Sequence, residues 1–255
     1  MKKTGVSIAG FDPSGGAGIL LDTAVFKREG IYPMGVITAV LPQNSIGVTN
    51  YFPMDIKQIM ESLERIEKDF TIGGIKIGVI GKLNIAEAIY VFIKDKNYPV
   101  VLDPVFVSGT GFELYDDELL EFFREKLISE VSLITPNLKE MELLSGEKIK
   151  NEKDAVQVAV SFSSIYKVRL LLKGGHIKGN DFLIEGNTVK KIEGKLVDKD
   201  VHGTGCFLSS MILSKMIKEK DKPLFYIIVE SKRILFDKIK QSIKLGNGKK
   251  YYMEV

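Results

Sequence analysis

The sequence predicts an α/β fold with a mostly parallel central sheet, helices on both faces and a small antiparallel extension. Short apolar runs alternate along the chain with longer segments whose apolar residues recur at helical spacing. Such alternation indicates βαβ units with buried parallel strands. Further along, two short runs flank Gly186-Asn187, which is typical of a β-hairpin. Because no repeat, low-complexity stretch or linker interrupts the chain, we expect a single domain over residues 1–255.

The individual elements follow from these patterns. The expected parallel strands are Val6–Ala9, Val36–Val40, Gly74–Ile77, Val100–Leu102, Leu133–Ile134 and Leu170–Leu172. The helices expected between them are Met54–Phe70, Ile85–Ile93, Glu118–Leu127, Leu138–Leu144 and Ala155–Ile165, with a further one after the first glycine-rich turn. The hairpin pairs Phe182–Glu185 with Thr188–Ile192, and the helices Cys206–Lys218 and Pro223–Lys244 close the chain.

Composition narrows the function. The net charge is only +3, from 36 basic and 33 acidic residues, which argues against broad binding of nucleic acids or membranes. No apolar run approaches the ~20 residues that span a bilayer. The apolar run Val6–Ala9 is too short for a signal peptide, and the single cysteine, Cys206, excludes an internal disulfide. We therefore expect a cytoplasmic protein.

Polar residues at the ends of the apolar runs are the candidate site, because ligands of open parallel sheets bind beyond the carboxyl ends of the strands. After the first run, Gly10–Gly18 contains four glycines in nine residues and leads into a helix. Glycines let the backbone approach a ligand, and the amides at a helix start favour an anion. The spacing matches neither a P-loop nor a dinucleotide fingerprint. A tight turn that needs glycine only for its geometry is the structural alternative.

Three later runs end in charged or amide side chains. Asp103 is placed to bind Mg²⁺, although capping a turn explains it equally well. Asn137 and Glu140 form the pattern of a helix capping box, so a metal or nucleotide role for Glu140 is the second interpretation. Lys173, before Gly174-Gly175, suggests a cation that faces phosphate oxygens, with a snorkelling lysine as the alternative.

The most informative stretch is His202-Gly203-Thr204-Gly205-Cys206 at the start of a helix. Its glycines allow successive N–H groups to converge on a phosphoryl group. The positive end of the helix is expected to lower the pKa of Cys206, which would then act as the base toward a hydroxyl group. A small buried cysteine that only fills space is the alternative. Together these parts indicate a phosphotransferase outside the P-loop class, without naming its acceptor.

These motifs, taken together, resemble the hydroxymethylpyrimidine/phosphomethylpyrimidine kinases of thiamine biosynthesis, a branch of the ribokinase-like superfamily. The resemblance covers about Val6 to Gly248. It rests on seven stretches in order: Ala9–Ile19 with Asp22, Val36–Ala39 with Gln43-Asn44, Lys76–Gly78, Val101–Val105, Leu133–Leu138 with Glu140, Lys173–His176, and His202–Cys206.

The resemblance implies a ribokinase-like sheet of eight to ten strands, commonly in a homodimer, that uses ATP and Mg²⁺ to phosphorylate the pyrimidine's hydroxymethyl group and then the resulting monophosphate. Gln43 would hydrogen-bond the ring's amino and ring nitrogens, as an amide with both donor and acceptor can. The resemblance also implies that Gly10, Asp22, Val79 and Val105 line the acceptor pocket. It implies that the nucleotide is bound by Asn137, Glu140, Lys173 and Thr204, and that the metal is bound by Asp103 and Glu140. Phosphoryl transfer would depend on Gly203, Gly205 and Lys173, with Cys206 as the base.

Some positions depart from the family's pattern. Phe11 replaces a small hydroxyl residue, Pro42 a small residue, and Val201 and Phe207 replace threonines. Phe11 is expected to narrow the acceptor pocket or stack on the ring, and Phe207 to shift the nucleotide.

Three other functions stay open. A pyridoxal/pyridoxine kinase of the same cysteine-bearing type is the runner-up, because its acceptor is also a hydroxymethyl group on an aromatic nitrogen ring; Gln43-Asn44 favours the pyrimidine. A ligand sensor without activity would not need all of the phosphoryl-transfer residues. A sugar kinase is disfavoured because Cys206 stands where that class has an aspartate.

Overall fold

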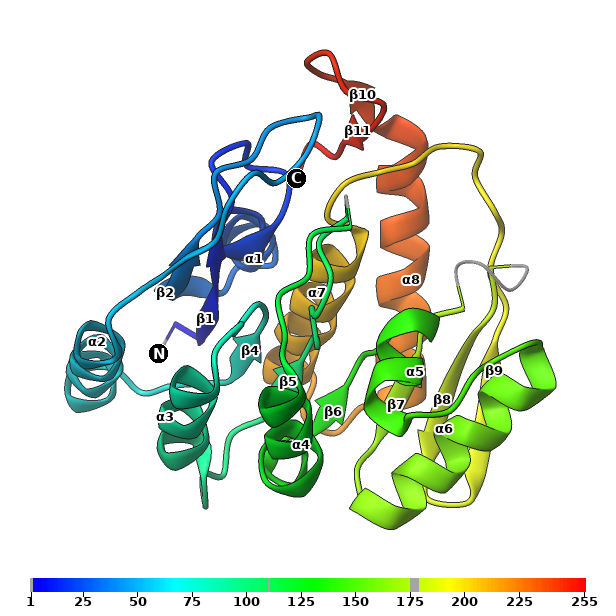
Figure 1. The fold of residues 1–255 in the computed structure, drawn as a ribbon, viewed down its shortest axis with the longest axis horizontal. Coiled ribbons are helices and arrows are strands. Elements are labelled where there is room, and N and C mark those ends of the chain that lie inside the picture. The colour runs from blue at the N-terminus through cyan, green and yellow to red at the C-terminus, as the bar shows by residue number, and fades with distance from the viewer. Residues whose placement is uncertain (1, 110, 175–178) are drawn as a thin grey trace.

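The computed structural model describes residues 2–109, 111–174 and 179–255, and in this part of the chain nine strands form one central sheet. The strand order is β3-β2-β1-β4-β5-β6-β7-β8-β9 (Figure 1). The strands are β1 Thr4–Phe11, β2 Tyr32–Val40, β3 Phe52–Pro53, β4 Ile75–Ile77, β5 Val100–Leu102, β6 Leu133–Ile134, β7 Leu170–Leu172, β8 Asp181–Glu185 and β9 Thr188–Ile192. The six central strands β2, β1, β4, β5, β6 and β7 run parallel, whereas β3 at one edge and the β8–β9 hairpin at the other run antiparallel.

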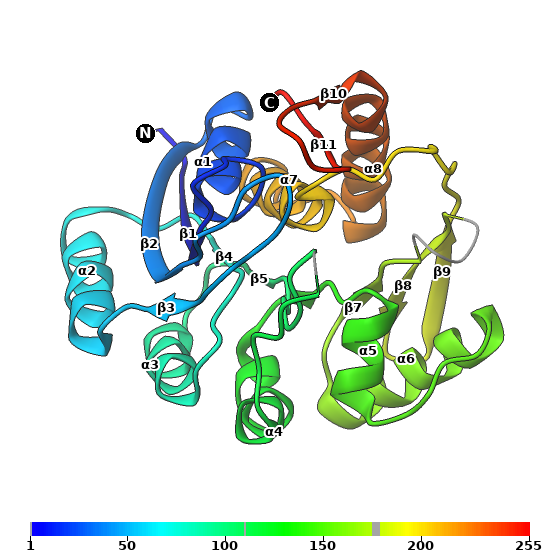
Figure 2. The same ribbon diagram turned by 45° about the horizontal axis from the view of Figure 1, so that its top comes forward.

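Helices cover both faces of this sheet, as Figure 2 shows. Their bounds are α1 Gly18–Arg28, α2 Ile56–Asp69, α3 Leu83–Ile93, α4 Asp117–Glu125, α5 Leu138–Ser145, α6 Glu152–Tyr166, α7 Thr204–Lys218 and α8 Leu224–Gln241, with a 3₁₀ turn at Leu127–Glu130. Helices α2 to α6 lie on one face and α1, α7 and α8 on the other. None of the described helices is long and apolar enough to cross a membrane.

The buried strands divide their side chains between two cores. In β5, Val100 and Leu102 join the core under α2 to α6, and Val101 joins the core under α1, α7 and α8. β7 alternates in the same way, with Leu171 facing the α7 side. Successive side chains of a strand point to opposite faces, so a continuous apolar run is what a sheet covered on both sides requires. The predicted fold class is confirmed.

Local capping fixes several helix starts. Asp55, Asp116 and Asn151 each accept a backbone N–H in the first turn of α2, α4 and α6. α5 begins with the predicted capping box, in which Asn137 and Glu140 exchange hydrogen bonds.

The chain's last segment differs from the prediction. The helix expected over Pro223–Lys244 ends at Gln241, because Ser242 adopts an extended conformation with φ −60° and ψ 143°. Ile243–Lys244 then forms β10, which pairs antiparallel with β11, Tyr251–Tyr252. Figures 1 and 2 place this small ribbon beside the loops that follow β1 and β2.

Candidate active site

Side chains that the sequence predicted for the site follow the carboxyl ends of three strands. Asp103 follows β5, Asn137 follows β6 and Lys173 follows β7, and Asn137 and Lys173 form a parallel bridge. Lys173 Nζ donates to Asp103 Oδ1 at 2.7 Å and lies 3.7 Å from Glu140 Oε2. Thr135 Oγ1 also donates to Asp103 Oδ1, at 3.2 Å. The fold thus gathers one cation and two carboxylates at the carboxyl edge of the sheet.

Burial and mutual charge set the protonation of this cluster. Burial opposes the charge on Lys173, but Asp103 and Glu140 outweigh it and raise the pKa of Lys173. Burial likewise opposes the charge on Asp103, yet Lys173 and Lys76 hold its pKa below the ordinary value. For Glu140 burial prevails over Lys173 and raises the pKa to about 7. Near neutral pH, Glu140 therefore exchanges a proton while Asp103 stays ionised.

Glu140 has a structural role and faces the cluster at the same time. Its Oε2 accepts from the backbone N–H of Asn137 at 2.7 Å, and its own N–H donates to Asn137 Oδ1 at 3.0 Å. The same Oε2 is the atom that faces Lys173. The capping role predicted from the sequence is confirmed, whereas the metal or nucleotide role of Glu140 stays a prediction.

The start of α7 packs against this cluster. A Cβ on Gly205 would lie 3.2 Å from Lys173 Nζ and 3.4 Å from Asp103 Oδ2, so the backbone there faces both charges. Gly203, the N-cap, has φ +76°, and a Cβ there would lie 1.9 Å from the carbonyl oxygen of Gly16. No side chain caps the 15-residue helix. The first N–H groups of α7 therefore have no side-chain cap and begin beside Lys173, a setting that suits an anion.

Cys206 lies partly buried in the first turn of α7. Burial raises the pKa of its thiol to about 11; Lys76 opposes this rise, while Asp22 and Asp103 add to it. The prediction of a lowered pKa was wrong, because burial and two nearby carboxylates raise the pKa of Cys206. At neutral pH the free protein carries Cys206 as a neutral thiol.

Asp22 belongs to a fully buried polar group beneath Cys206. Its Oδ2 accepts from Ser7 Oγ at 2.6 Å and from Lys76 Nζ at 2.9 Å, and its Oδ1 accepts from Ser210 Oγ at 2.8 Å. The side chains of Asp22 and Lys76 are both 0% exposed. Protein groups occupy both carboxylate oxygens, so contact of Asp22 with an acceptor stays a prediction. The sequence pattern assigned Lys76 no role of its own, although a lysine inside an apolar strand is the signal that could have revealed it.

The other residues expected to line the acceptor pocket lie at the carboxyl ends of β1, β2, β4 and β5. Val79 and Val105 pack in one small apolar cluster with Leu41. A Cβ on Gly10 would lie 2.5 Å from Leu41 Cδ1 and 3.5 Å from Val79 Cβ, so Gly10 borders the same cluster. Gln43 bridges to Val48, a member of that cluster.

Asp12 ties the first glycine-rich loop to the start of α7, a role the sequence did not reveal. Its Oδ1 accepts from the N–H and Oγ of Ser14, and its Oδ2 accepts from the N–H of Ala17. His202 Nε2 lies 2.9 Å from the same Oδ2. Burial raises the pKa of Asp12, but its bonds with His202 and Ser14 prevail and lower it.

One departure from the family's pattern, Phe207, lies in the hydrophobic core. Phe207 is fully buried in the core with Leu208 and Met211, which argues against the expected effect on a nucleotide. Phe11 ends β1 and is half-buried. Gly175 and His176 lie outside the described residues.

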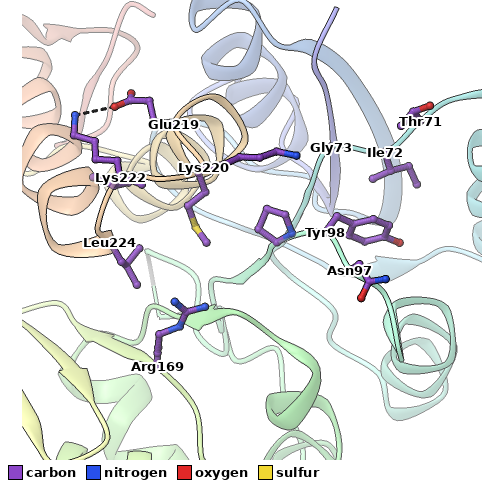
Figure 3. Close-up of a pocket in the computed structure, with 13 residues that line it drawn as sticks. Thr71, Ile72, Gly73, Asn97, Tyr98, Arg169, Glu219, Lys220, Lys222 and Leu224 are labelled. Carbon is purple, nitrogen blue, oxygen red and sulfur yellow. Dashed lines mark hydrogen bonds and ion pairs between the residues drawn. The ribbon is translucent and has the colours of Figure 1, made fainter. Parts of the chain in front are cut away.

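A cavity of about 560 Å³ lies at the amino ends of the parallel strands, opposite the candidate site (Figure 3). Its lining includes Gly73, Pro99 and Arg169, which precede β4, β5 and β7, and Lys220, which follows the end of α7. The predicted site residues lie instead at the opposite ends of these elements. None of them lines this cavity.

Comparisons with known proteins show the family to which the chain belongs. Residues 12–253 match the family model described as phosphomethylpyrimidine kinase. A hydroxymethylpyrimidine/phosphomethylpyrimidine kinase of Aquifex aeolicus is 43% identical over 249 residues, which covers 95% of this chain and 96% of that protein.

Two solved structures share the fold over most of their length. An ADP complex of Bacillus subtilis pyridoxal kinase superposes with a TM-score of 0.88 at 29% identity, covering 100% of this chain and 97% of that one. A phosphomethylpyrimidine kinase from Clostridium difficile gives a TM-score of 0.80 at 32% identity, covering 92% and 99%. With the family model spanning nearly the whole chain and the predicted motifs meeting at one edge of the sheet, the protein belongs to the phosphomethylpyrimidine kinase family.

Proposed function

We propose that this protein transfers the γ-phosphoryl group of ATP to the hydroxymethyl group of 4-amino-5-hydroxymethyl-2-methylpyrimidine, and then phosphorylates the monophosphate to the diphosphate for thiamine biosynthesis. The observation that carries the proposal is the uncapped start of α7 facing Lys173 and Asp103 through Gly205. The activity named for the Aquifex aeolicus relative supports the choice of acceptor.

Each part of the site has a task in this transfer. Phosphoryl transfer depends on positioning and on neutralising charge, with little covalent work by the protein. The N–H groups at Gly203–Cys206 would hold the phosphoryl group during its transfer. Lys173 would hold the phosphates of the nucleotide, together with Asn137 and Thr204. Cys206 would take the proton of the attacking hydroxyl group. Its raised pKa makes that step dependent on first losing the thiol proton.

Asp103 and Glu140 are proposed to hold the Mg²⁺ that accompanies ATP. Mg²⁺ in such sites uses one or two carboxylates and completes its shell with phosphate oxygens and water, so this pair suits it. Within the described ranges no group of three or more His, Cys, Asp or Glu could hold a metal. Bound there, the ion would neutralise charge on the transferred group.

The acceptor pocket is proposed to consist of Gly10, Gln43, Val79 and Val105, with Asp22 supporting its floor. Val79 and Val105 would contact the flat ring, and the amide of Gln43 would pair with its amidine edge. We also propose that the chain is one domain, forms a homodimer and works in the cytoplasm. Light scattering coupled to size exclusion tests the dimer.

The proposal is tested by measuring ADP release with ATP, Mg²⁺ and one of three acceptors: the hydroxymethylpyrimidine, its monophosphate, or pyridoxal. We expect turnover of both pyrimidines and slow turnover of pyridoxal. Pyridoxal kinase is the second candidate, because the Bacillus subtilis enzyme superposes over the whole chain. Turnover of pyridoxal alone would establish that candidate instead, and no turnover at all would favour a sensor.

A further inference from the structure

The chain's last segment, residues 243–255, crosses the loops around the acceptor pocket. Tyr251 donates its N–H to Asp200 O at 2.9 Å and accepts from His202 N at 2.9 Å. Gly248 donates its N–H to Ser45 Oγ at 3.0 Å. The segment therefore joins the loop that carries Gln43 to the loop that leads into α7.

Side chains of this segment fit closely against the site. The ring of Tyr252 meets the ring of His202 edge-on, with centroids 5.7 Å apart. A Cβ on Gly16 would lie 2.4 Å from His202 and 2.6 Å from Tyr252, so the glycine-rich loop packs directly on both rings.

A small pocket lies between these parts. It is lined by Gln43, Asn44, Ser45, Gly109, His202, Lys250 and Tyr252. Its cavity volume is about 10 Å³, roughly the room that one water molecule needs. The residue proposed to bind the ring thus shares a pocket with His202, next to the anion-binding glycines, and with a lysine from the end of the chain.

Lys250 has hydrogen-bonding capacity to spare, unlike the two buried lysines of the site. Its Nζ donates to Gly109 O at 2.7 Å and lies 3.8 Å from Asp200 Oδ1. The side chain of Asp200 is 68% exposed, so water screens this ion pair. An ammonium group has three N–H donors. Lys76 and Lys173, by contrast, are held by buried carboxylates at 2.9 and 2.7 Å. Among the described residues that line this pocket, Lys250 is the one lysine.

The second phosphorylation makes a demand that the first does not. Its acceptor carries a phosphate group with about −1.5 to −2 charges at neutral pH, and this anion must approach the phosphates of ATP. A phosphate oxygen of the acceptor attacks the γ-phosphorus, the bond from that phosphorus to the bridging oxygen breaks, and ADP leaves with that oxygen. A cation beside the acceptor's phosphate would offset the repulsion between the two anions.

We propose that Lys250 binds the phosphate group of the monophosphate acceptor and so determines specificity for the second phosphorylation. The inference rests on the proposed function, and it assigns the end of the chain a part in it. Lys250 would exchange its bond with Gly109 O for phosphate oxygens when this acceptor enters. The hydroxymethyl acceptor has no charge for Lys250 to meet.

The test compares K250M with K249M, since Lys249 is the exposed neighbouring lysine and gives a matched loss of charge. The readout is the ratio of kcat/KM for the monophosphate to kcat/KM for the hydroxymethylpyrimidine. We expect K250M to lower this ratio about 10- to 100-fold, the range for one charge-assisted hydrogen bond. K249M should change it less than about 2-fold, and K250R, which keeps the charge, should recover most of the loss.

Two further measurements keep the outcomes distinct. The Ki of the monophosphate as an inhibitor of the first step should rise in K250M by a factor similar to the loss in the ratio, and thermal denaturation checks folding. An unchanged ratio in K250M, or an equal loss in K249M, would overturn the role of Lys250. If the wild-type protein phosphorylates neither pyrimidine, the proposed function itself fails, which is a different result.

Discussion

Lys173 Nζ lies 2.7 Å from Asp103 Oδ1 and 3.7 Å from Glu140 Oε2, so a single cation serves two buried carboxylates. The backbone of Gly205 faces the same ammonium group from the start of α7. Lys173 therefore connects the carboxylates proposed to hold the metal with the N–H groups proposed to hold the phosphoryl group.

Removing this cation should impair both catalysis and folding. We expect K173M to lower kcat/KM for ATP about 10²- to 10³-fold, the usual loss when one preorganised group is removed from a transition state. It should also lower the free energy of unfolding, by about 3 kcal/mol or more, because two carboxylates lose their partner. Steady-state kinetics and urea denaturation measure the two effects. K153M, at an exposed lysine, is the control. A K173M enzyme within about 3-fold of wild type would remove Lys173 from the mechanism.

The role of Cys206 can be tested through pH. Because the pKa of its thiol is raised to about 11, the thiolate fraction grows about tenfold with each pH unit below that value. We expect kcat to rise from pH 8 to 10 in the wild type, and C206A to lower kcat about 10²- to 10⁴-fold. C206D places an ionised carboxylate there and should give a flat profile. A flat wild-type profile, or near-normal kcat in folded C206A, would contradict the base assignment.

Glu140 should control a separate transition at lower pH. Its pKa is raised to about 7, so its charged form, which binds cations, appears as pH rises through that value. We expect kcat/KM for ATP to increase between pH 6 and 8 in the wild type, and E140Q to lack this inflection.

The titration of Glu140 should lower the free energy of unfolding as pH rises, whereas it raises kcat/KM. The folded pKa of Glu140 lies above its unfolded value, so the folded state holds a proton that the unfolded state releases between about pH 4.5 and 7. Its contribution to the free energy of unfolding is complete below pH 4.5 and is lost as pH rises through about 7. Urea denaturation at several pH values, with E140Q as the reference without this titration, measures it. Parallel curves for the two proteins would refute the raised pKa.

Much of the fold was predictable because its signals are local. The buried strands are short apolar runs, and the capping box at Asn137 and Glu140 is a matter of spacing along the chain. The small ribbon of β10 and β11 was not predictable in this way, because Tyr251 is fixed by hydrogen bonds to Asp200 and His202, about 50 residues earlier.

The sequence predicted which residues meet at the site better than it predicted their pKa values. Strand ends alone place Asp103 and Lys173 at one edge of the sheet. The pKa of Cys206 depends instead on burial and on Asp22 and Asp103, which approach it only in the folded chain. The roles of Asp12 and Lys250 could not be predicted from the sequence for the same reason, because their partners lie in distant loops.

Gly203 should tolerate no side chain. Its φ of +76° strains any other residue, and a Cβ would lie 1.9 Å from the carbonyl oxygen of Gly16. We expect G203A to lower kcat/KM by more than about 100-fold, because the start of α7 must shift. G30A is the matched control: Gly30 has φ +75° but no atom within 4 Å of the added Cβ. It should cost only backbone strain, about 1–2 kcal/mol, and keep kcat/KM. Equal losses of activity in both variants would show that strain alone explains the effect.

The buried pair of Asp22 and Lys76 distinguishes support of the site from contact with the acceptor. K76M leaves Asp22 with an unpaired charge and should lower the free energy of unfolding by about 3–5 kcal/mol. Adding D22N removes that charge, so the double variant should be more stable than K76M, with a positive coupling in the double-mutant cycle. In D22N alone, Ser7 and Ser210 still find an amide partner. Lys76, however, loses its carboxylate partner, so we expect D22N to lower the free energy of unfolding while KM for the pyrimidine stays close to the wild-type value. A large rise in KM at unchanged stability would instead place Asp22 in contact with the acceptor.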